Sequence, residues 1–332
     1  MKITFFSAQP YDEAYFTKVA ENDFKDYNFD LNFVSETLSK DIVEKAKGAG
    51  AVCAFVNDDL SGEILESLNK YGVKTILMRC AGFDRVDLDT AKKLDILVAC
   101  VPAYSPEAIA EHAIALLLTL NRNTNRAFNR IQKNNFALDG LLGSNLYKKT
   151  AGVIGTGKIG LATARIFKGF GMEVIAYDPY PTDKFDEIGK YVELDELIER
   201  SDVISLHCPL TSDNHHIINA NVLKKMKDTA FLINTSRGGL VDSEALLKAL
   251  QNDEIAGAAL DVYENEATLF FKDLSDQETS DDLLEQLNKL DNFLITGHQA
   301  FFTQEALTQI SQITLGNLAA AIDGKEVENA VI

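Results

Sequence analysis

The chain has 332 residues, which exceeds the usual size of one domain and predicts two. Its formal net charge of −18 argues against nucleic acid as a partner, because a phosphate backbone is bound by basic surface. No apolar run approaches the roughly 20 residues that cross a bilayer, and the short apolar N-terminus does not have the pattern of a signal peptide. We therefore expect a cytoplasmic protein that binds neither nucleic acid nor membrane.

The residues that commonly bind metals do not have ligand spacing. The two adjacent histidines, His215 and His216, are not placed to share one helical face, and we interpret them as loop residues. The cysteines form no C-x-x-C pair, so buried reduced thiols are the expectation rather than disulfides or zinc ligands. We expect no metal. The four cysteines are Cys53, Cys80, Cys100 and Cys208.

The first hundred residues alternate short apolar runs with polar segments of helix length. The runs cover residues 3–6, 51–56, 75–78 and 96–101. Such alternation predicts parallel strands joined by crossover helices in an open α/β sheet.

A second alternating series begins at Ala151, and its first strand leads into a glycine-rich turn. Its six expected strands cover residues 151–154, 174–177, 203–206, 230–234, 255–260 and 293–296. Six strands in this arrangement match the doubly wound fold that binds dinucleotides.

The glycine-rich turn has the spacing G-x-G-x-x-G, with Gly155, Gly157 and Gly160. The first glycine permits a tight strand-to-helix turn, the second lets the backbone approach a pyrophosphate, and the third lets the helix pack on the strand. The pyrophosphate is then bound at the positive end of the helix. Asp178 follows Gly160 by 18 residues, at the end of the next strand. A carboxylate there accepts hydrogen bonds from ribose hydroxyls and repels a 2′-phosphate, so NAD is favoured over NADP.

Residues 105–120 predict a helix that begins with Ser105 as N-cap and Pro106 in the first turn. Because this helix is apolar around most of its circumference, we expect it to be buried between domains or subunits, and a homodimer is the simpler expectation. His112 within it is interpreted as a packed residue. The acidic segment 273–288 is expected to be a surface insertion with a helix, and a last helix after Thr303 is expected to return to the first domain.

Three polar residues follow predicted strands, where a hydride-transferring enzyme needs groups that hold a substrate and handle a proton. Arg237 can bind a carboxylate through two parallel hydrogen bonds. His298 can act as a general acid and base near neutral pH. A carboxylate at its other ring nitrogen would fix its tautomer. Glu266 is the proposed partner, with Asp261 and Glu264 as open alternatives.

Taken together, these motifs resemble, in order and spacing, the NAD-dependent D-2-hydroxyacid dehydrogenases. The resemblance spans nearly the whole chain. Thr-Gly-His-Gln-Ala-Phe and the long acidic segment after Glu266 resemble the bacterial subgroup that reduces pyruvate to D-lactate. The motifs are Arg79-Cys-Ala-Gly82-Phe-Asp, Val101-Pro-Ala-Tyr104-Ser-Pro-Glu, Gly155-Thr-Gly157-Lys-Ile-Gly160, Asp178-Pro179, Leu206-His-Cys-Pro-Leu210, Asn234-Thr-Ser-Arg237-Gly-Gly, Asp261-Val-Tyr-Glu-Asn-Glu266 and Thr296-Gly-His298-Gln-Ala-Phe301.

The resemblance implies a Rossmann NAD-binding domain, residues 103–298, inserted in a flavodoxin-like catalytic domain, residues 1–102 and 299–332. It implies that Arg237 binds the substrate carboxylate and that His298, held by Glu266, is the acid and base. The implied NAD contacts are Gly155, Gly157, Lys158, Ile159, Gly160, Asp178, Cys208, Pro209, Asn214, Thr235, Ser236 and Asp261. The implied substrate contacts are Cys80, Ala81, Gly82 and Tyr104, with Phe55 and Phe301 limiting the group on the substrate's C3.

The leading hypothesis for function is reversible NADH-dependent reduction of pyruvate to D-lactate. A preference for a bulkier 2-keto acid is the alternative within the same class. From another class comes a dinucleotide-sensing binding protein similar to transcriptional corepressors, which the absence of basic or disordered tails disfavours. Whether expected dimers pair further into dimers of dimers stays open.

Overall fold

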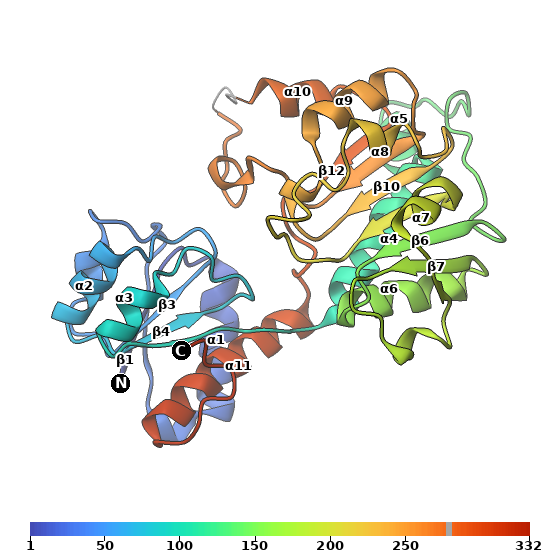
Figure 1. Ribbon diagram of the computed structural model, residues 1–332. Coiled ribbons are helices and arrows are strands. Elements are labelled where there is room, and N and C mark those ends of the chain that lie inside the picture. The colour runs from blue at the N-terminus through green and yellow to red at the C-terminus, as the bar shows by residue number, and fades with distance from the viewer. Residues whose placement is uncertain (277–280) are drawn as a thin grey trace. The chain divides into compact units, whose positions relative to one another are not determined.

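The computed structural model describes residues 1–276 and 281–332, which form two compact units (Figure 1). Unit 1 comprises Met1–Ser105 and Phe302–Ile332, and unit 2 comprises Pro106–Phe301. The chain crosses between units three residues later than the sequence-based boundaries on both occasions. Tyr104 therefore belongs to unit 1 and Phe301 to unit 2, the reverse of the expected assignment.

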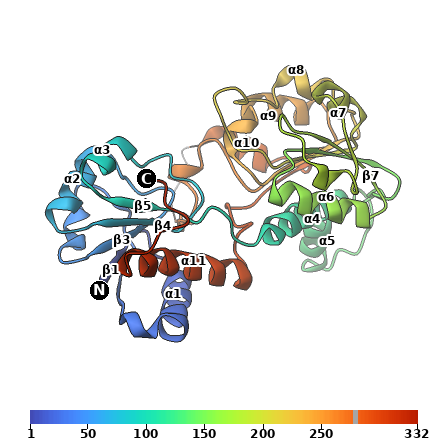
Figure 2. The same cartoon turned by 60° about the horizontal axis from the view of Figure 1, so that its bottom comes forward.

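Unit 1 contains a five-stranded parallel sheet with the strand order β2-β1-β3-β4-β5, which is the flavodoxin-like order. Figure 2 shows helices α1 and α11 on one face of this sheet and α2 and α3 on the other. Strand β2, which pairs with β1 at the edge, was not expected from the sequence. The elements are β1 (Lys2–Phe5), α1 (Pro10–Asp23), β2 (Asp30–Phe33), β3 (Ala51–Ala54), α2 (Gly62–Lys70), β4 (Thr75–Met78), α3 (Leu88–Lys93), β5 (Leu97–Ala99) and α11 (Gln304–Ile322).

Unit 2 contains a seven-stranded parallel sheet with the order β12-β11-β10-β9-β6-β7-β8. The order reverses direction beside β6, the strand that leads into the glycine-rich turn, as in a Rossmann fold. Six of its strands match the predicted series, and the seventh, β8, was missed. The elements are α4 (Pro106–Arg122), α5 (Thr124–Ile131), β6 (Thr150–Ile154), α6 (Lys158–Gly169), β7 (Glu173–Tyr177), β8 (Lys190–Tyr191), α7 (Leu194–Arg200), β9 (Val203–Leu206), α8 (Ala220–Leu223), β10 (Phe231–Asn234), α9 (Ser243–Gln251), β11 (Gly257–Leu260), α10 (Asp282–Asn288) and β12 (Phe293–Ile295).

Both faces of the unit 2 sheet are covered by apolar helices. Helices α4 and α6 pack together on one face, and α7 and α9 contribute to the apolar cluster on the other. Strands of such a sheet are buried on both sides, which explains why they read as continuous apolar runs rather than as alternating patterns.

The apolar character of α4 is explained within unit 2. The helix contacts α6, β10, β11 and β12, and residues from several of its sides are buried there, including Ala113, Leu116 and Leu117. Its burial therefore requires no second subunit. Six large apolar side chains that remain exposed lie soon after it, in residues 128–147.

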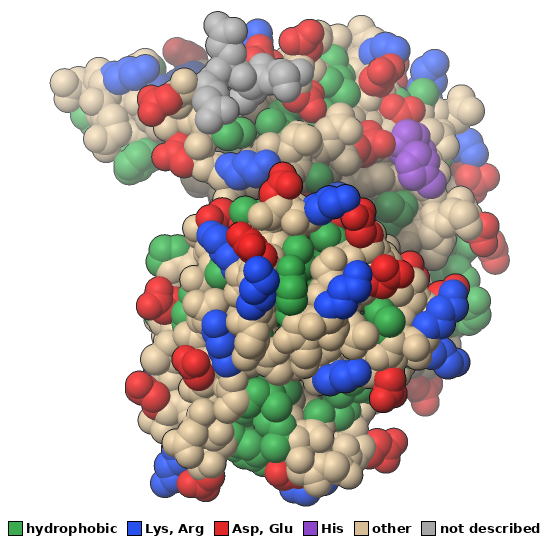
Figure 3. Space-filling model, turned by 90° about the vertical axis from the view of Figure 1, so that its left-hand side faces the viewer, with side chains coloured by type: hydrophobic (Ala, Val, Ile, Leu, Met, Phe, Trp, Pro, Cys, Tyr) green, Lys and Arg blue, Asp and Glu red, His purple; other side chains and the backbone are tan. Residues whose placement is uncertain are grey.

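The last helix, α11, packs on α1 and β4 of unit 1, which confirms the expected return of the chain. Part of the acidic segment 273–288, residues 277–280, lies outside the described residues, and α10 occupies the end of that segment. Within the described part of the chain, no helix combines the length and apolar character needed to cross a bilayer. On the face drawn in Figure 3, Lys and Arg side chains are interspersed with Asp and Glu side chains.

Candidate active site

The glycine-rich turn after β6 is too close-packed for side chains at two of its three glycines. Gly155 has a φ of +94°, and a Cβ there would lie 2.7 Å from the Cys208 backbone nitrogen. A Cβ on Gly160 would lie 1.9 Å from the Gly155 carbonyl oxygen. In contrast, a Cβ on Gly157 would meet nothing within 4 Å. Gly157 is the N-cap of α6, so the open space lies at the helix end whose free N–H groups attract anions.

Asp178 is held rigidly beside this turn at the end of β7. Its Oδ2 accepts hydrogen bonds from the Thr156 backbone N–H at 2.6 Å and the Thr156 hydroxyl at 2.9 Å, and its Oδ1 accepts one from the Tyr180 N–H at 2.8 Å. An ionised carboxylate has about four acceptor positions, so ribose hydroxyls can still be bound. Tyr191 of the unexpected strand β8 contacts the Thr156 hydroxyl at 2.8 Å and completes this arrangement.

The loop after β9 closes over the glycine turn from the other side. His207 and Cys208 occupy the space that a Gly155 side chain would need. Burial lowers the pKa of His207 to about 3 and raises the pKa of the Cys208 thiol to about 11, so both groups are neutral near pH 7. Neither adds charge beside the open end of α6.

The expected cofactor residues after β9 and β10 are linked to one another. The Ser236 hydroxyl donates to the Cys208 carbonyl at 2.5 Å, and the Asn214 amide donates to the Pro209 carbonyl at 2.7 Å. The Thr235 hydroxyl is buried without a hydrogen-bond partner in the described structure. Because buried hydroxyls are normally satisfied, this one is consistent with a polar ligand at the site.

His298 and Glu266 form a close pair, although they are 32 residues apart in the chain. The Nδ1 atom of His298 lies 2.7 Å from Oε1 of Glu266, and each side chain is about a quarter exposed. The other carboxylate oxygen of Glu266 accepts a hydrogen bond from the Tyr263 backbone N–H at 2.9 Å. With Nδ1 engaged, Nε2 is the ring atom left to exchange a proton with a substrate.

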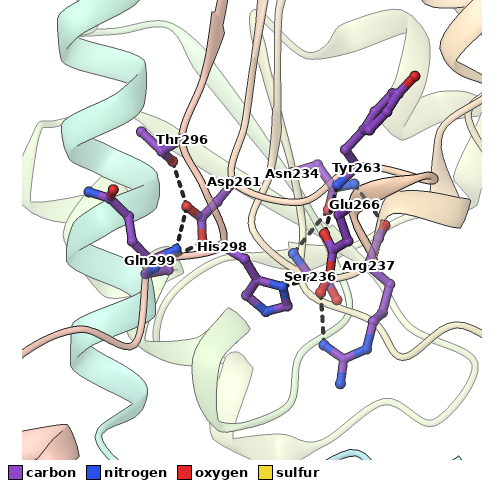
Figure 4. A network of polar contacts seen from close by, with 10 residues as sticks. Asn234, Ser236, Arg237, Asp261, Tyr263, Glu266, Thr296, His298 and Gln299 are labelled. Atoms are coloured by element: carbon purple, nitrogen blue, oxygen red, sulfur yellow. Dashed lines mark hydrogen bonds and ion pairs between the residues drawn. The ribbon is translucent and has the colours of Figure 1, made fainter. Parts of the chain in front are cut away.

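The two competing acids have other partners. Asp261 is fully buried and accepts hydrogen bonds from the Thr296 hydroxyl and from the backbone N–H groups of Gln299 and Ala300 (Figure 4). Burial alone would raise the pKa of Asp261, but hydrogen bonds from His112, Thr296 and these two N–H groups outweigh it and lower the pKa. Glu264 instead lies 2.5 Å from His216 Nε2.

Asp261 therefore fixes the loop that carries His298. The His298 N–H donates to the Asp261 carbonyl at 2.8 Å, and His298 adopts a φ of +53°, which is uncommon for a residue with a side chain. Such a backbone conformation costs about 1–3 kcal/mol and persists where surrounding contacts enforce it. Asp261 was expected among the NAD contacts, and the network around it was not foreseen.

Arg237 follows β10 on a turn held by Asn234. The Asn234 amide donates to the Arg237 carbonyl at 2.8 Å, and its Oδ1 accepts from the Ser236 N–H at 3.0 Å. The Arg237 guanidinium donates only to the adjacent Ser236 carbonyl among the hydrogen bonds of the described residues. Figure 4 shows this guanidinium and the His298 ring extending toward the same side of the network. A carboxylate and a neighbouring carbonyl can be bound by such a pair of groups.

The remaining substrate candidates are mostly in unit 1. The Phe55 ring lies 5.0 Å from the buried guanidinium of Arg79, and the Cys80 thiol donates to the Gly82 carbonyl at 3.2 Å. Ala81 lies between these two residues, and Tyr104 lies near the end of unit 1. Phe301 is buried in unit 2.

Comparison with known proteins identifies the family. The sequence profile described as D-isomer specific 2-hydroxyacid dehydrogenase, NAD binding domain, matches residues 114–300. The chain is 50% identical to a D-lactate dehydrogenase of Escherichia coli over 333 aligned residues, which cover all of both chains. This chain belongs to the D-isomer specific 2-hydroxyacid dehydrogenases.

Solved structures agree with this assignment. The apo-structure of D-lactate dehydrogenase from Escherichia coli superimposes with a TM-score of 0.92 at 48% identity and covers all of both chains. The NAD-complexed D-isomer specific 2-hydroxyacid dehydrogenase from Lactobacillus delbrueckii ssp. bulgaricus does so with a TM-score of 0.86 at 32% identity, also over both whole chains. The present dehydrogenase is accordingly an NAD-dependent enzyme, and its glycine turn, Asp178 carboxylate and unpartnered Thr235 hydroxyl fit that cofactor.

Proposed function

We propose that this dehydrogenase reduces pyruvate to D-lactate, reversibly and with NADH. The observation that carries the proposal is the His298–Glu266 pair beside Arg237, in a chain half identical to a D-lactate dehydrogenase over its full length. Bound NADH supplies the hydride that reduces the keto carbon. The protein's own residues bind the acid group and deliver the proton.

His298 handles the proton. Its protonated Nε2 donates to the keto oxygen as negative charge develops there, and in the reverse direction the neutral ring accepts the hydroxyl proton. Glu266 holds Nδ1, which keeps the ring in one orientation and leaves Nε2 to face the substrate. The Tyr263 N–H fixes the far oxygen of Glu266, so the carboxylate itself cannot rotate freely.

Arg237 binds the substrate carboxylate through its planar guanidinium, which can form two parallel hydrogen bonds. Arg237→Lys keeps the positive charge but loses the two-point contact. We expect KM for pyruvate to rise and kcat to fall, because the keto group is then less well aligned with His298. Unchanged kinetics in this variant would remove Arg237 from the proposed site.

The size of the accepted substrate depends, in this proposal, on the residues that the family resemblance assigns to substrate binding. Phe55 and Phe301 limit the group attached to C3, while Cys80, Ala81, Gly82 and Tyr104 provide further substrate contacts. Steady-state rates with NADH and pyruvate, 2-ketoisocaproate or phenylpyruvate test this assignment. Pyruvate is expected to give the highest kcat/KM, and a clear preference for either bulkier acid would contradict it.

We still propose a homodimer, but the evidence for it is now a group of exposed apolar side chains after α4 rather than the apolar character of α4 itself. Phe136, Leu138 and Leu142 expose 71%, 82% and 95% of their surface, and Phe128 and Ile131 on α5 are also more than half exposed. Exposed apolar side chains this concentrated mark association surfaces, and a second copy of the chain is the proposed occupant. Sedimentation should give a dimer, and the double variant Leu138→Asp, Leu142→Asp should give monomers. A monomeric parent protein would refute the proposal.

A cytoplasmic location remains a prediction from the sequence.

A further inference from the structure

A cluster of two imidazoles and one carboxylate lies outside the proposed catalytic residues. His215 and His216 come from the loop before α8, and Glu264 comes from the segment after β11, 48 residues from His216. One ligand atom from each residue lies within 4.8 Å of the other two. We propose that these three residues bind a divalent transition metal ion and that Zn²⁺ suits them best.

The ligand types favour zinc over the hard cations. Zinc in proteins takes imidazole nitrogen and carboxylate oxygen, and a three-residue site leaves its fourth position to water. Magnesium and calcium prefer oxygen ligands throughout, which two histidines do not provide. From the sequence we expected no metal here, because adjacent histidines do not share one helical face. The folded chain brings the distant Glu264 beside them.

The present geometry requires only a small adjustment. His216 Nε2 and Glu264 Oε1 are 2.5 Å apart, a hydrogen-bond distance. With zinc–ligand bonds of about 2.0–2.2 Å in a tetrahedral arrangement, the two atoms would be about 3.4 Å apart. The zinc ion would therefore take the place of the proton that lies between His216 Nε2 and Glu264 Oε1, and these two atoms would move apart by less than about 1 Å. His215 stacks on His216 with ring centroids 3.9 Å apart, and its exposed ring can rotate toward the ion.

Surrounding contacts already fix two of the three ligands. The second oxygen of Glu264 accepts a hydrogen bond from the Ser243 N–H at the start of α9, at 3.1 Å. The His216 N–H donates to the Gly239 carbonyl at 2.9 Å, and the His216 carbonyl accepts from the Asn219 amide at 3.1 Å. Outer contacts of this kind orient ligands in metal sites and strengthen binding.

The two glycines after Arg237 make space for His215, the third ligand, and let the two segments approach each other. A Cβ on Gly239 would lie 3.4 Å from Cδ2 of His215, so the glycine gives the ring its space. Gly238 packs directly on the backbone of Tyr263 and Glu264, which brings the two segments together. The proposed metal site and the catalytic pair share no ligand, because Glu266, not Glu264, holds His298.

The test is zinc binding to the full-length protein after treatment with a chelator. Zn²⁺ is titrated in competition with a chromophoric chelator, and thermal unfolding is followed with and without the ion. We expect one site per chain and a higher Tm in zinc, because an ion that binds only the folded state stabilises it. His215→Ala and Glu264→Gln should each weaken binding at least about tenfold, since even outer-contact losses cost about 10- to 100-fold.

The matched control is Glu244→Gln, which removes an exposed carboxylate from the first turn of α9 outside the cluster. Its zinc affinity should equal that of the parent protein. His215→Ala changes an exposed side chain, so misfolding does not obscure its result. Absence of zinc binding by the parent overturns the proposal. Zinc affinity that is unchanged in both His215→Ala and Glu264→Gln also overturns it. Zinc binding that is lost only in His298→Asn overturns it as well, because that result would assign the ion to the catalytic pair.

Discussion

Gly157→Ala separates cofactor binding from folding. The structure leaves space for the new methyl group in the free protein, because a Cβ at this position meets nothing within 4 Å. That space is the one we assign to the pyrophosphate at the N-terminus of α6. The variant should therefore fold normally and bind NADH poorly.

The expected size of the effect follows from the contacts at stake. A methyl group between the backbone and the phosphate removes at least one hydrogen bond to a charged group, which contributes about 1.5–3 kcal/mol. The dissociation constant for NADH should rise about 10- to 100-fold, at about 1.4 kcal/mol for each factor of ten. The free energy of unfolding should fall by no more than about 1 kcal/mol, the cost of alanine as a poorer N-cap.

Titration of NADH fluorescence gives the dissociation constant, and urea unfolding gives the stability. Gly169→Ala is the matched control, since a Cβ there also meets nothing within 4 Å but lies at the other end of α6. It should leave NADH binding unchanged. Gly160→Ala should instead destabilise the fold, because its Cβ would lie 1.9 Å from the Gly155 carbonyl oxygen. Unchanged NADH affinity in Gly157→Ala would refute this reasoning about the glycine turn.

Three further substitutions test other parts of the site. Glu266→Gln should lower kcat about 10²- to 10⁴-fold, as in triads whose imidazole loses its carboxylate. Glu244→Gln is the control and should leave kcat unchanged. An unchanged kcat in Glu266→Gln would contradict the role of Glu266. Asp178→Ala should reduce the preference for NADH over NADPH in kcat/KM, and equal selectivity would count against its assignment. Burial depresses the pKa of His207 to about 3. Between that pH and about 6.5, the ordinary pKa of histidine, the unfolded chain binds a proton at this residue that the folded chain does not. The free energy of unfolding therefore decreases as pH falls through this range. His207→Gln should therefore show a smaller loss of Tm from pH 7 to pH 5 than the parent protein, and parallel pH profiles would disprove this.

Local patterns in the sequence were sufficient for most of the fold. Buried parallel strands read as continuous apolar runs, and the glycine turn follows one of them directly. The two missed strands are edge strands with weak signals: β2 is partly polar and exposed, and β8 has two residues. Pairing with β1 and β7 defines these strands, and such pairing is not visible in a single short segment.

The sequence also could not decide which acid holds His298. Asp261, Glu264 and Glu266 lie within six residues of one another after β11, and each is a plausible hydrogen-bond acceptor. Their partners come from distant segments: Thr296 for Asp261, His216 for Glu264 and His298 for Glu266. Only the folded chain distinguishes the three, because the choice depends on contacts 32 to 48 residues away.

The same limit applies to α4. Its apolar circumference correctly indicated burial, but a sequence does not show what covers a helix. The strands and α6 of its own unit do so.

The most direct test of the central claim is the product formed from pyruvate and NADH. The purified protein should oxidise NADH rapidly with pyruvate, and chiral chromatography should find D-lactate. His298→Asn should abolish this turnover while NADH still binds with nearly unchanged affinity. L-lactate as the product, or NADH binding without turnover of pyruvate, would contradict the account.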